Sequence, residues 1–233
     1  MTPHSRFVAG NLAAVALTGG ALLWLSRDGS IDFAVARLFF DPAAGNFPLK
    51  DGALLAQAGH TALRWLVISI WLGAVALLAA SWRIAALRAW RARLVYFSAT
   101  VAVCTLLVSL VKMASAHSCP WDLAMFGGQA HWFPLLGAPE AASGPGRCWP
   151  GAHSASGFSL VAGYFAFRDG HRAAAWTALG VALALGTLMG LVQVARGAHF
   201  LTHNLWSLWI AWLCCLAGYV AWRKTGGNNE LAA

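Results

Sequence analysis

The chain has 233 residues, of which 59% are hydrophobic and only 10% are charged, and its mean hydropathy is +0.63. A soluble globular domain has about a quarter of its residues charged, so this composition excludes an ordinary soluble protein and favours one that spans a bilayer. The formal net charge is +8, but the basic residues form no continuous patch, and we expect no nucleic-acid partner. Several basic residues lie instead in one short segment between apolar stretches: Arg83, Arg88, Arg91 and Arg93.

Six apolar stretches approach the roughly 20 residues that a helix needs to cross a bilayer. The segment DFAVARLFFDPAAGNFPLKD follows the first stretch, and its apolar part is too short to span, so we expect it to lie at the membrane interface. No internal repeat is visible. We predict an all-α fold, a polytopic bundle of six transmembrane helices that forms a single domain over residues 1–233. The spans are expected near 7–26, 65–82, 94–112, 154–168, 173–195 and 203–222, and the fourth is the shortest.

The distribution of basic residues predicts the orientation. Arginines follow the second span, and Arg223 and Lys224 follow the last, whereas the connection 113–153 carries a single arginine, Arg147. Because cytoplasmic loops are enriched in Lys and Arg, both termini should be cytoplasmic and the loop 113–153 should face outward. We therefore expect a multi-pass protein of a bacterial inner membrane, with its active-site loop in the periplasm.

Five of the eight histidines gather at this expected outer face, together with one lysine and two arginines. Charged groups near lipid are costly, so such clustering indicates a functional site. The cluster lacks the oxygen ligands that Mg²⁺ or Ca²⁺ requires, and its cations and histidines suit a phosphate group instead. Its members are Lys112, His117, Cys119, Asp122, His131, Arg147, His153, Arg196, His199 and His203.

The start of the fourth stretch offers a second feature of an anion site. Pro150 and Gly151 break the chain, and Ser154 or Ser156 is expected to cap a helix that begins near His153. A helix N-terminus has free N–H groups and a positive dipole end, both of which favour an anion. We therefore count Ser154 among the candidates for phosphate binding.

These residues resemble the type 2 phosphatidic-acid phosphatase (PAP2) superfamily of membrane enzymes, whose motifs are K-x6-R-P, P-S-G-H and S-R-x5-H-x3-D. The segment KMASAHSCP supplies Lys112 and has Cys119 and Pro120 in place of the Arg-Pro pair. The segment PGAH supplies His153 as the histidine of the second motif. Each motif alone is degenerate, but their order and spacing together are fairly specific.

The third motif is matched by VQVARGAHFLTH. This segment places Gln193 at the family arginine, His199 at the nucleophile and His203 at the aspartate. The resemblance implies that His199 accepts the phosphoryl group and that His153 is the general acid. It also implies that Lys112 anchors the phosphate and that neither a metal ion nor another cofactor takes part.

The two family arginines are absent, and we expect Arg196 and Arg147 to supply the missing charge. His203 can accept a hydrogen bond from the nucleophile, although it stabilises an imidazolium less well than a carboxylate does. Asp122 is a candidate for part of that role. Gln193 and His117 are counted as supporting residues.

Other interpretations remain open at this stage. His153 alone would suit a structural helix cap. His199 and His203 match a metal-binding pair on a helix, with His117, His131, Cys119 or Asp122 as a third ligand. The chain could also be a non-catalytic protein that binds anionic headgroups, or a small transporter. A transporter would show polar residues at mid-bilayer, whereas these stretches are almost free of charge.

Cys119 and Cys148 share the outer connection, which faces an oxidising compartment if the orientation holds, and a disulfide between them is a hypothesis. The enzyme is expected to hydrolyse a lipid phosphomonoester or diphosphate, with a polyprenyl diphosphate or lipid A favoured because these present phosphate at the outer leaflet. The alternative is transfer of the phosphoryl group to another lipid. The expected partners are this lipid and the bilayer, and the sequence does not indicate an oligomeric state.

Overall fold

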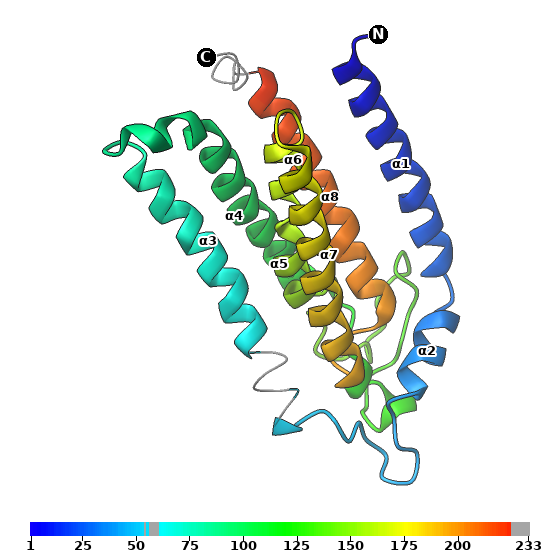
Figure 1. Ribbon diagram of the computed structural model, residues 1–233. Helices are drawn as coiled ribbons and strands as arrows, with labels where there is room; N and C mark the ends of the chain where they lie inside the picture. The colour runs from blue at the N-terminus through cyan, green and yellow to red at the C-terminus, as the bar shows by residue number, and fades with distance from the viewer. Residues whose placement is uncertain (54, 56–60, 225–233) are drawn as a thin grey trace.

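The computed structural model describes residues 1–53, 55 and 61–224, and the regular secondary structure in that part of the chain is helical (Figure 1). Five segments are long and apolar enough to cross a membrane, which confirms the predicted all-α membrane architecture. One of them combines the 3₁₀ helix η2 (Ala85–Trp90) with α4. The long helices are α1 (Pro3–Leu25), α3 (Leu63–Ala80), α4 (Arg91–Ala114), α7 (Arg172–Ala195) and α8 (Leu201–Lys224).

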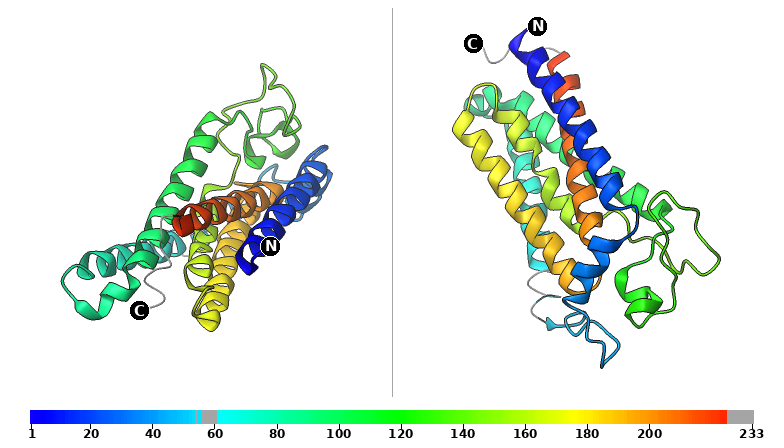
Figure 2. Two further views of the ribbon diagram at one scale, coloured as in Figure 1. Left: turned by 90° about the horizontal axis from the view of Figure 1, so that it is seen from above. Right: turned by 90° about the vertical axis from the view of Figure 1, so that its right-hand side faces the viewer.

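The fourth expected span differs from the prediction. It consists of two short helices, α5 (Ala152–Ser159) and α6 (Ala162–Phe167), which follow one another after a break at Leu160 and Val161. Neither is long enough to cross a membrane alone, so the structure does not show six continuous spanning helices. Helix α5 packs against α4, α7 and α8 in the middle of the bundle (Figures 1 and 2). Because neighbouring helices cover it, this segment is largely buried.

Small residues allow α5 and α7 to approach closely. A Cβ added at Gly157 would lie 2.7 Å from both the Cα and the backbone nitrogen of Gly186, a distance that real Cβ atoms do not reach. Glycines at such crossings let helix backbones touch, which is a common way to pack helices in membranes. The position of α5, and with it the residue His153, therefore depends on this contact.

Helix α1 is fastened to α8 by tryptophan side chains. The indole N–H of Trp209 donates to the backbone carbonyl of Val15 at 2.8 Å, and that of Trp212 donates to Oδ1 of Asn11 at 3.0 Å. At the end of α1, the indole of Trp206 donates to the hydroxyl of Ser26 at 3.1 Å. These bonds follow one face of α8 along much of the length of α1.

The segment after α1 contains a short helix, α2 (Ser30–Arg37). We expected this segment to lie at the membrane interface, but its Phe47 is buried against Phe126, whose ring in turn contacts Phe200. Helix α2 and the long connection between α4 and α5 lie at the same end of the molecule (Figure 1). That connection contains two 3₁₀ helices, η3 (Pro120–Asp122) and η4 (Ala124–Phe126). The segment from α2 to Phe47 therefore packs against the connection between α4 and α5 at this end of the molecule.

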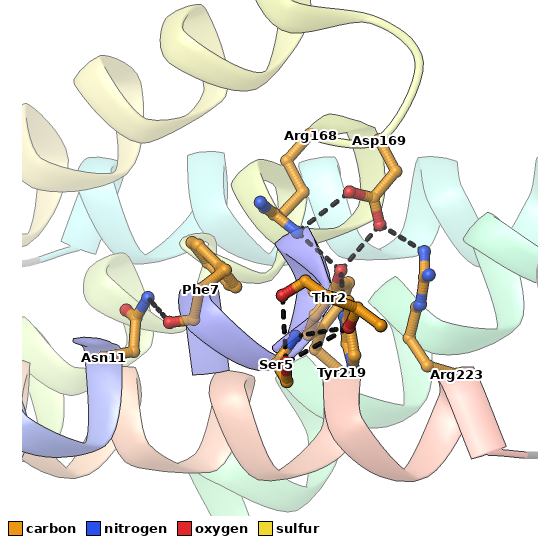
Figure 3. Close-up of polar contacts among 9 residues, drawn as sticks. Thr2, Ser5, Phe7, Asn11, Arg168, Asp169, Tyr219 and Arg223 are labelled. Atoms are coloured by element: carbon orange, nitrogen blue, oxygen red, sulfur yellow. Dashed lines mark hydrogen bonds and ion pairs between the residues drawn. The ribbon is translucent and has the colours of Figure 1, made fainter. Parts of the chain in front are cut away.

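A network of polar side chains lies at the end of the bundle that carries the N-terminus and the end of α8 (Figure 3). The Asp169 carboxylate accepts a hydrogen bond from the Tyr219 hydroxyl at 2.6 Å and pairs with Arg223 at 2.7 Å and with Arg168 at 2.8 Å. The Arg168 guanidinium also lies 3.4 Å above the ring of Phe7. The network therefore joins α1, the turn after α6 and α8 at the end opposite to the histidine cluster.

Candidate active site

Three separate parts of the chain bring the expected catalytic residues to one end of the bundle. Lys112 lies in the last turn of α4, His153 in the first turn of α5, and His199 in the short connection between α7 and α8. His203 follows in the first turn of α8, and its ring centroid lies 5.9 Å from that of His199. The site is therefore built from helix ends, which a rigid bundle holds in place.

The environment of His199 suits a nucleophile. Only 4% of the residue is exposed, and this burial lowers the pKa of its imidazole well below the usual value of 6.5. The nearby charges of Lys112, His203 and His153 lower this pKa further. Because only a neutral imidazole has the lone pair that attacks phosphorus, His199 is in its reactive form at neutral pH.

The start of α5 is locked to α8. The backbone N–H of Gly151 donates to the carbonyl of His203 at 3.2 Å, and the Ser207 hydroxyl donates to the Gly151 carbonyl at 2.9 Å. The Ser154 hydroxyl donates to Oδ1 of Asn204 at 2.7 Å. His153 is thus held in a fixed position relative to His203.

The prediction for Ser154 was wrong in two respects. Gly151 occupies the N-cap position of α5, and no side chain caps this helix. Ser154 is 0% exposed, and its hydroxyl is used by Gly151 and Asn204, so it offers no surface to a phosphate. The physical reason is that the first turn of α5 is enclosed by α4, α7 and α8. Ser154 is a packing residue between two helices.

The structure contains a disulfide between Cys119 and Cys148, which links the ends of the first and second motifs. The Cys148 sulfur lies 3.4 Å from Nδ1 of His199. A disulfide sulfur carries no hydrogen, so the imidazole N–H is the donor in this contact. That leaves Nε2 of His199 with the lone pair that a nucleophile needs.

The same contact bears on the metal interpretation. Ligand atoms of Cys148, His199 and His203 lie within 4.8 Å of one another. A sulfur ligand must be a thiolate, however, and Cys148 is engaged in the disulfide. The disulfide form of the protein therefore offers only two donors of this set, His199 and His203.

Arg196 and Gln193 form a pair beside the nucleophile loop. The Arg196 Nε donates to the Lys50 carbonyl at 2.9 Å, and its Nη1 donates to Oε1 of Gln193 at 3.3 Å. The Gln193 side chain is 3% exposed, and within the described residues its Nε2 has no hydrogen-bond partner. The backbone carbonyl of Gln193 also accepts from the N–H of His199 at 3.3 Å. Gln193 thus links the nucleophile to a guanidinium at the place of the family arginine.

The other charged candidates lie in less specific surroundings. Arg147 is exposed and has a positive φ of 57°, and its backbone N–H donates to the carbonyl of Ser115 at 2.7 Å. Asp122 ends η3, and its backbone carbonyl accepts from Gln129 and Ala130. Among the described residues, no carboxylate forms an ion pair with His199 or His203. The structure therefore does not bring Asp122 into the role that we considered for it.

His117 lies at the edge of the site. Its ring stacks on Phe133 with 4.3 Å between centroids, and its Nε2 lies 3.3 Å from the carbonyl of Leu135. Burial lowers the pKa of this imidazole, so it is neutral at neutral pH. His131 instead pairs with Glu140 at the surface, 3.8 Å apart. His117 can contribute polarity to the site but not a fixed positive charge.

An apolar groove reaches the site between α3 and α4. A cavity of about 410 Å³ is lined by Val67, Trp71, Thr105, Leu106 and further residues of these helices, and by Ser156 of α5. A neighbouring cavity of about 300 Å³ shares Val67 and Thr105 and adds Arg64 and His153. The two cavities share part of their lining, and the second brings apolar surface next to the expected general acid His153. Arg64 is not among the residues that the sequence indicated for the site.

A second residue that sequence reasoning missed is Asp32. It lies on α2, is 4% exposed, and accepts hydrogen bonds from the backbone N–H and the hydroxyl of Thr202, the neighbour of His203. The only sequence signal is an acidic residue within the apolar segment SIDFAVARLFF. Nothing in that segment indicates a partner that lies 170 residues further along the chain.

Comparison with known proteins identifies the family of the chain. The sequence model of the PAP2 superfamily matches residues 93–226, from the start of α4 past the end of α8. No curated protein and no solved structure matches the chain. Members of the superfamily are generally phosphatases that act on phosphate esters. Since the match covers more than half of the chain and includes Lys112, His153 and His199, the protein belongs to the PAP2 superfamily.

Proposed function

We propose that the protein is a lipid phosphatase that hydrolyses a phosphomonoester or diphosphate of a membrane lipid through a phosphohistidine at His199. The observation that carries this proposal is the buried His199 at the end of the bundle where Lys112 lies in the last turn of α4 and His153 in the first turn of α5. An apolar groove leads to the same His153, as a lipid substrate requires. The combination of a phosphate site with an apolar approach fits a lipid better than a soluble ester.

The reaction follows from these positions in two steps. In the first, Nε2 of His199 attacks phosphorus, the bond to the lipid oxygen breaks, and His153 donates a proton to that oxygen. In the second, His153 takes a proton from water, the water attacks the phosphohistidine, and inorganic phosphate leaves. Lys112 and the pair of Gln193 and Arg196 hold the phosphoryl oxygens and neutralise the charge that develops on them.

The lipid chain would occupy the groove between α3 and α4. The wall of the groove is almost entirely apolar, and the indole of Trp71 on it is fixed by a hydrogen bond to the carbonyl of Ser98 at 3.0 Å. Arg64 lies at the end near His153, where a negatively charged headgroup would arrive. A cation at the polar end and an apolar wall below it match the two ends of a lipid phosphate.

The positive-inside rule supports an outward-facing site. The arginine-rich connection around η2 lies at the end that carries both termini, opposite to the histidine cluster (Figure 1). The disulfide at the site is of the kind that persists in oxidising compartments. We therefore assign the site to the outer face of a bacterial inner membrane, and we favour a polyprenyl diphosphate or lipid A as substrate because both present phosphate there.

The test is phosphate release by the detergent-purified protein from a panel of lipid phosphates, with and without a chelator. We expect release from one lipid class, unaffected by the chelator and abolished in His199→Ala and His153→Ala. His171→Ala is the matched control, because His171 lies at the other end of the bundle, where its ring contacts Trp90. Full activity of His199→Ala would exclude the phosphohistidine. Release only when a second lipid is present would identify the enzyme as a phosphotransferase.

A further inference from the structure

Asp32 holds the backbone that carries His203. Its Oδ1 accepts the N–H of Thr202 at 2.9 Å, and its Oδ2 accepts the Thr202 hydroxyl. Thr202 lies in the first turn of α8, where the helix dipole favours a negative charge. A carboxylate at this place therefore fixes the residue directly before His203. A purely structural helix cap would make the same hydrogen bonds to Thr202.

A small polar cavity lies beside the same carboxylate. Its volume is about 20 Å³, and Asp32, His117, Trp149 and His203 are among the residues that line it. His203 is 7% exposed, and in the part of the chain that the structure describes its Nδ1 has no hydrogen-bond partner. The buried indole Nε1 of Trp149 likewise has none among the described residues. A cavity of this size has room for one water, and a buried water makes about three hydrogen bonds.

We propose that Asp32 is the positioning residue of His203 and acts on it through a water molecule held in this cavity. The water accepts hydrogen bonds from Nδ1 of His203 and Nε1 of Trp149, and it donates one hydrogen to the Asp32 carboxylate. His203 is thereby held in the tautomer that carries its proton on Nδ1. The inference rests on the proposed function, because it gives a role to the histidine that replaces the family aspartate beside His199.

The charge of Asp32 distinguishes this role from that of a helix cap. Burial raises the pKa of the Asp32 carboxyl to about 6, so the group is ionised at neutral pH and becomes protonated under mildly acidic conditions. The titratable groups that share its cavity are His117 and His203. Arg27 and Asp28, at the end of α1, pair with each other at the surface, 3.4 Å apart. A positioning role predicts that activity follows the ionisation of Asp32, whereas a cap predicts that it does not.

The variant Asp32→Asn separates the two roles. Asparagine has the same shape, and it can accept the Thr202 N–H with its oxygen and donate to the Thr202 hydroxyl with its amide, so the cap is kept and the charge is lost. On the lipid that the wild type hydrolyses, we expect kcat to fall roughly tenfold or more while KM changes little. The acidic limb of the kcat profile near the Asp32 pKa of about 6 should disappear. Asp28→Asn is the matched control, since Asp28 contacts only the nearby Ser30 and Arg27 among the described residues, and it should behave as the wild type.

A second readout does not require activity. Nitrogen-15 NMR of labelled histidines reports the tautomer of His203, whose signals are assigned by their loss in His203→Gln. We expect a single Nδ1-protonated form in the wild type and in Asp28→Asn, and a mixture of tautomers in Asp32→Asn. Identical His203 signals together with an unchanged kcat and pH profile in Asp32→Asn would overturn the proposal. If the wild type releases phosphate from no lipid, the proposed function fails, and the NMR comparison alone then decides for or against Asp32.

Discussion

The Cys148 sulfur lies 3.4 Å from Nδ1 of His199, so the disulfide touches the imidazole that is expected to carry the phosphoryl group. In the superfamily motif the residue four positions after the nucleophile is an aspartate, and in this chain it is His203. A sulfur is a weaker acceptor than a carboxylate, but it is fixed between two motifs by a covalent bond. The orientation of the nucleophile ring thus depends on the disulfide.

Loss of the disulfide should reduce both activity and stability. We expect the double variant Cys119→Ser, Cys148→Ser to lose roughly ten- to a hundredfold in kcat, because small displacements of a catalytic group are costly. Because the cysteines have a sequence separation of 29, removal of the cross-link should also lower the free energy of unfolding by about 3 kcal/mol. Phosphate release and thermal unfolding in detergent measure the two effects. Cys214→Ser, which changes a free cysteine of α8, serves as the control, and equal losses in both proteins would contradict the prediction.

The buried His199 should make the protein sensitive to acid. Its pKa is well below 6.5 in the folded state and near 6.5 in the unfolded chain, so the unfolded chain binds more protons as the pH falls. The stability that the neutral imidazole contributes is present above pH 6.5 and is lost as the pH falls toward the folded pKa. His199→Gln lacks this group, and its melting temperature should fall less than that of the wild type between pH 7.5 and about pH 5. Parallel curves for the two proteins would contradict the argument.

The contribution of Asp32 to stability depends on pH in the opposite direction and over a lower pH range. Its folded pKa of about 6 exceeds the ordinary value of 3.8, so its contribution to stability is greatest below pH 3.8 and declines as the pH rises through about 6. Asp32→Asn should therefore gain stability relative to the wild type as the pH rises from about 4 to about 7. Melting temperatures of the two proteins at several pH values measure this difference. A difference that does not change with pH would show that Asp32 is not perturbed by burial.

The pair of Arg196 and Gln193 should be essential for the phosphoryl group. We expect Arg196→Ala to lower kcat/KM roughly a hundredfold, which is the usual cost of removing one donor to a developing negative charge. Arg172→Ala is a suitable control because Arg172 begins α7 at the opposite end of the molecule. The measurement is steady-state hydrolysis of the preferred lipid. Full activity of Arg196→Ala would show that this arginine does not replace the one missing from the motif.

The groove between α3 and α4 can be tested by filling it. Thr105→Trp should block hydrolysis of a long-chain lipid while leaving hydrolysis of a short-chain, water-soluble phosphate ester intact, because only the chain needs the groove. Thr18→Trp fills a groove of similar size, about 360 Å³, between α1 and α8, and should spare both substrates. Equal rates of lipid hydrolysis in the wild type and Thr105→Trp would place the lipid elsewhere.

Part of this molecule could be predicted from its sequence because the signals are local. Apolar stretches identified the long helices, and motif spacing identified Lys112, His153 and His199, which the fold brings to one end. The break at Leu160 could not be seen, since hydropathy records how apolar a segment is and not whether its backbone is continuous. Ser154 was misassigned for a related reason, because a helix start with a serine looks the same whether it faces a ligand or another helix.

The missed residues depend on contacts between distant parts of the chain. Asp32 meets Thr202 across 170 residues, and Arg64 joins the site only through a groove whose walls come from two further helices. Neither residue falls within the region that the family match covers. A motif reports residues within its own segment, so contacts with residues outside that segment become visible only in three dimensions.

The tryptophan contacts between α1 and α8 fix the position of α1 along the axis of α8. Trp206, Trp209 and Trp212 donate to acceptors at three different levels of α1, and a shift of α1 by one turn would leave all three indole N–H groups without their present acceptors. Inside a bilayer no water is available to replace them, so α1 has a single register on α8. Since α2 follows directly after α1, this register also sets the height at which Asp32 meets the first turn of α8. The N-terminal helix thus sets the position of α2 relative to the candidate site.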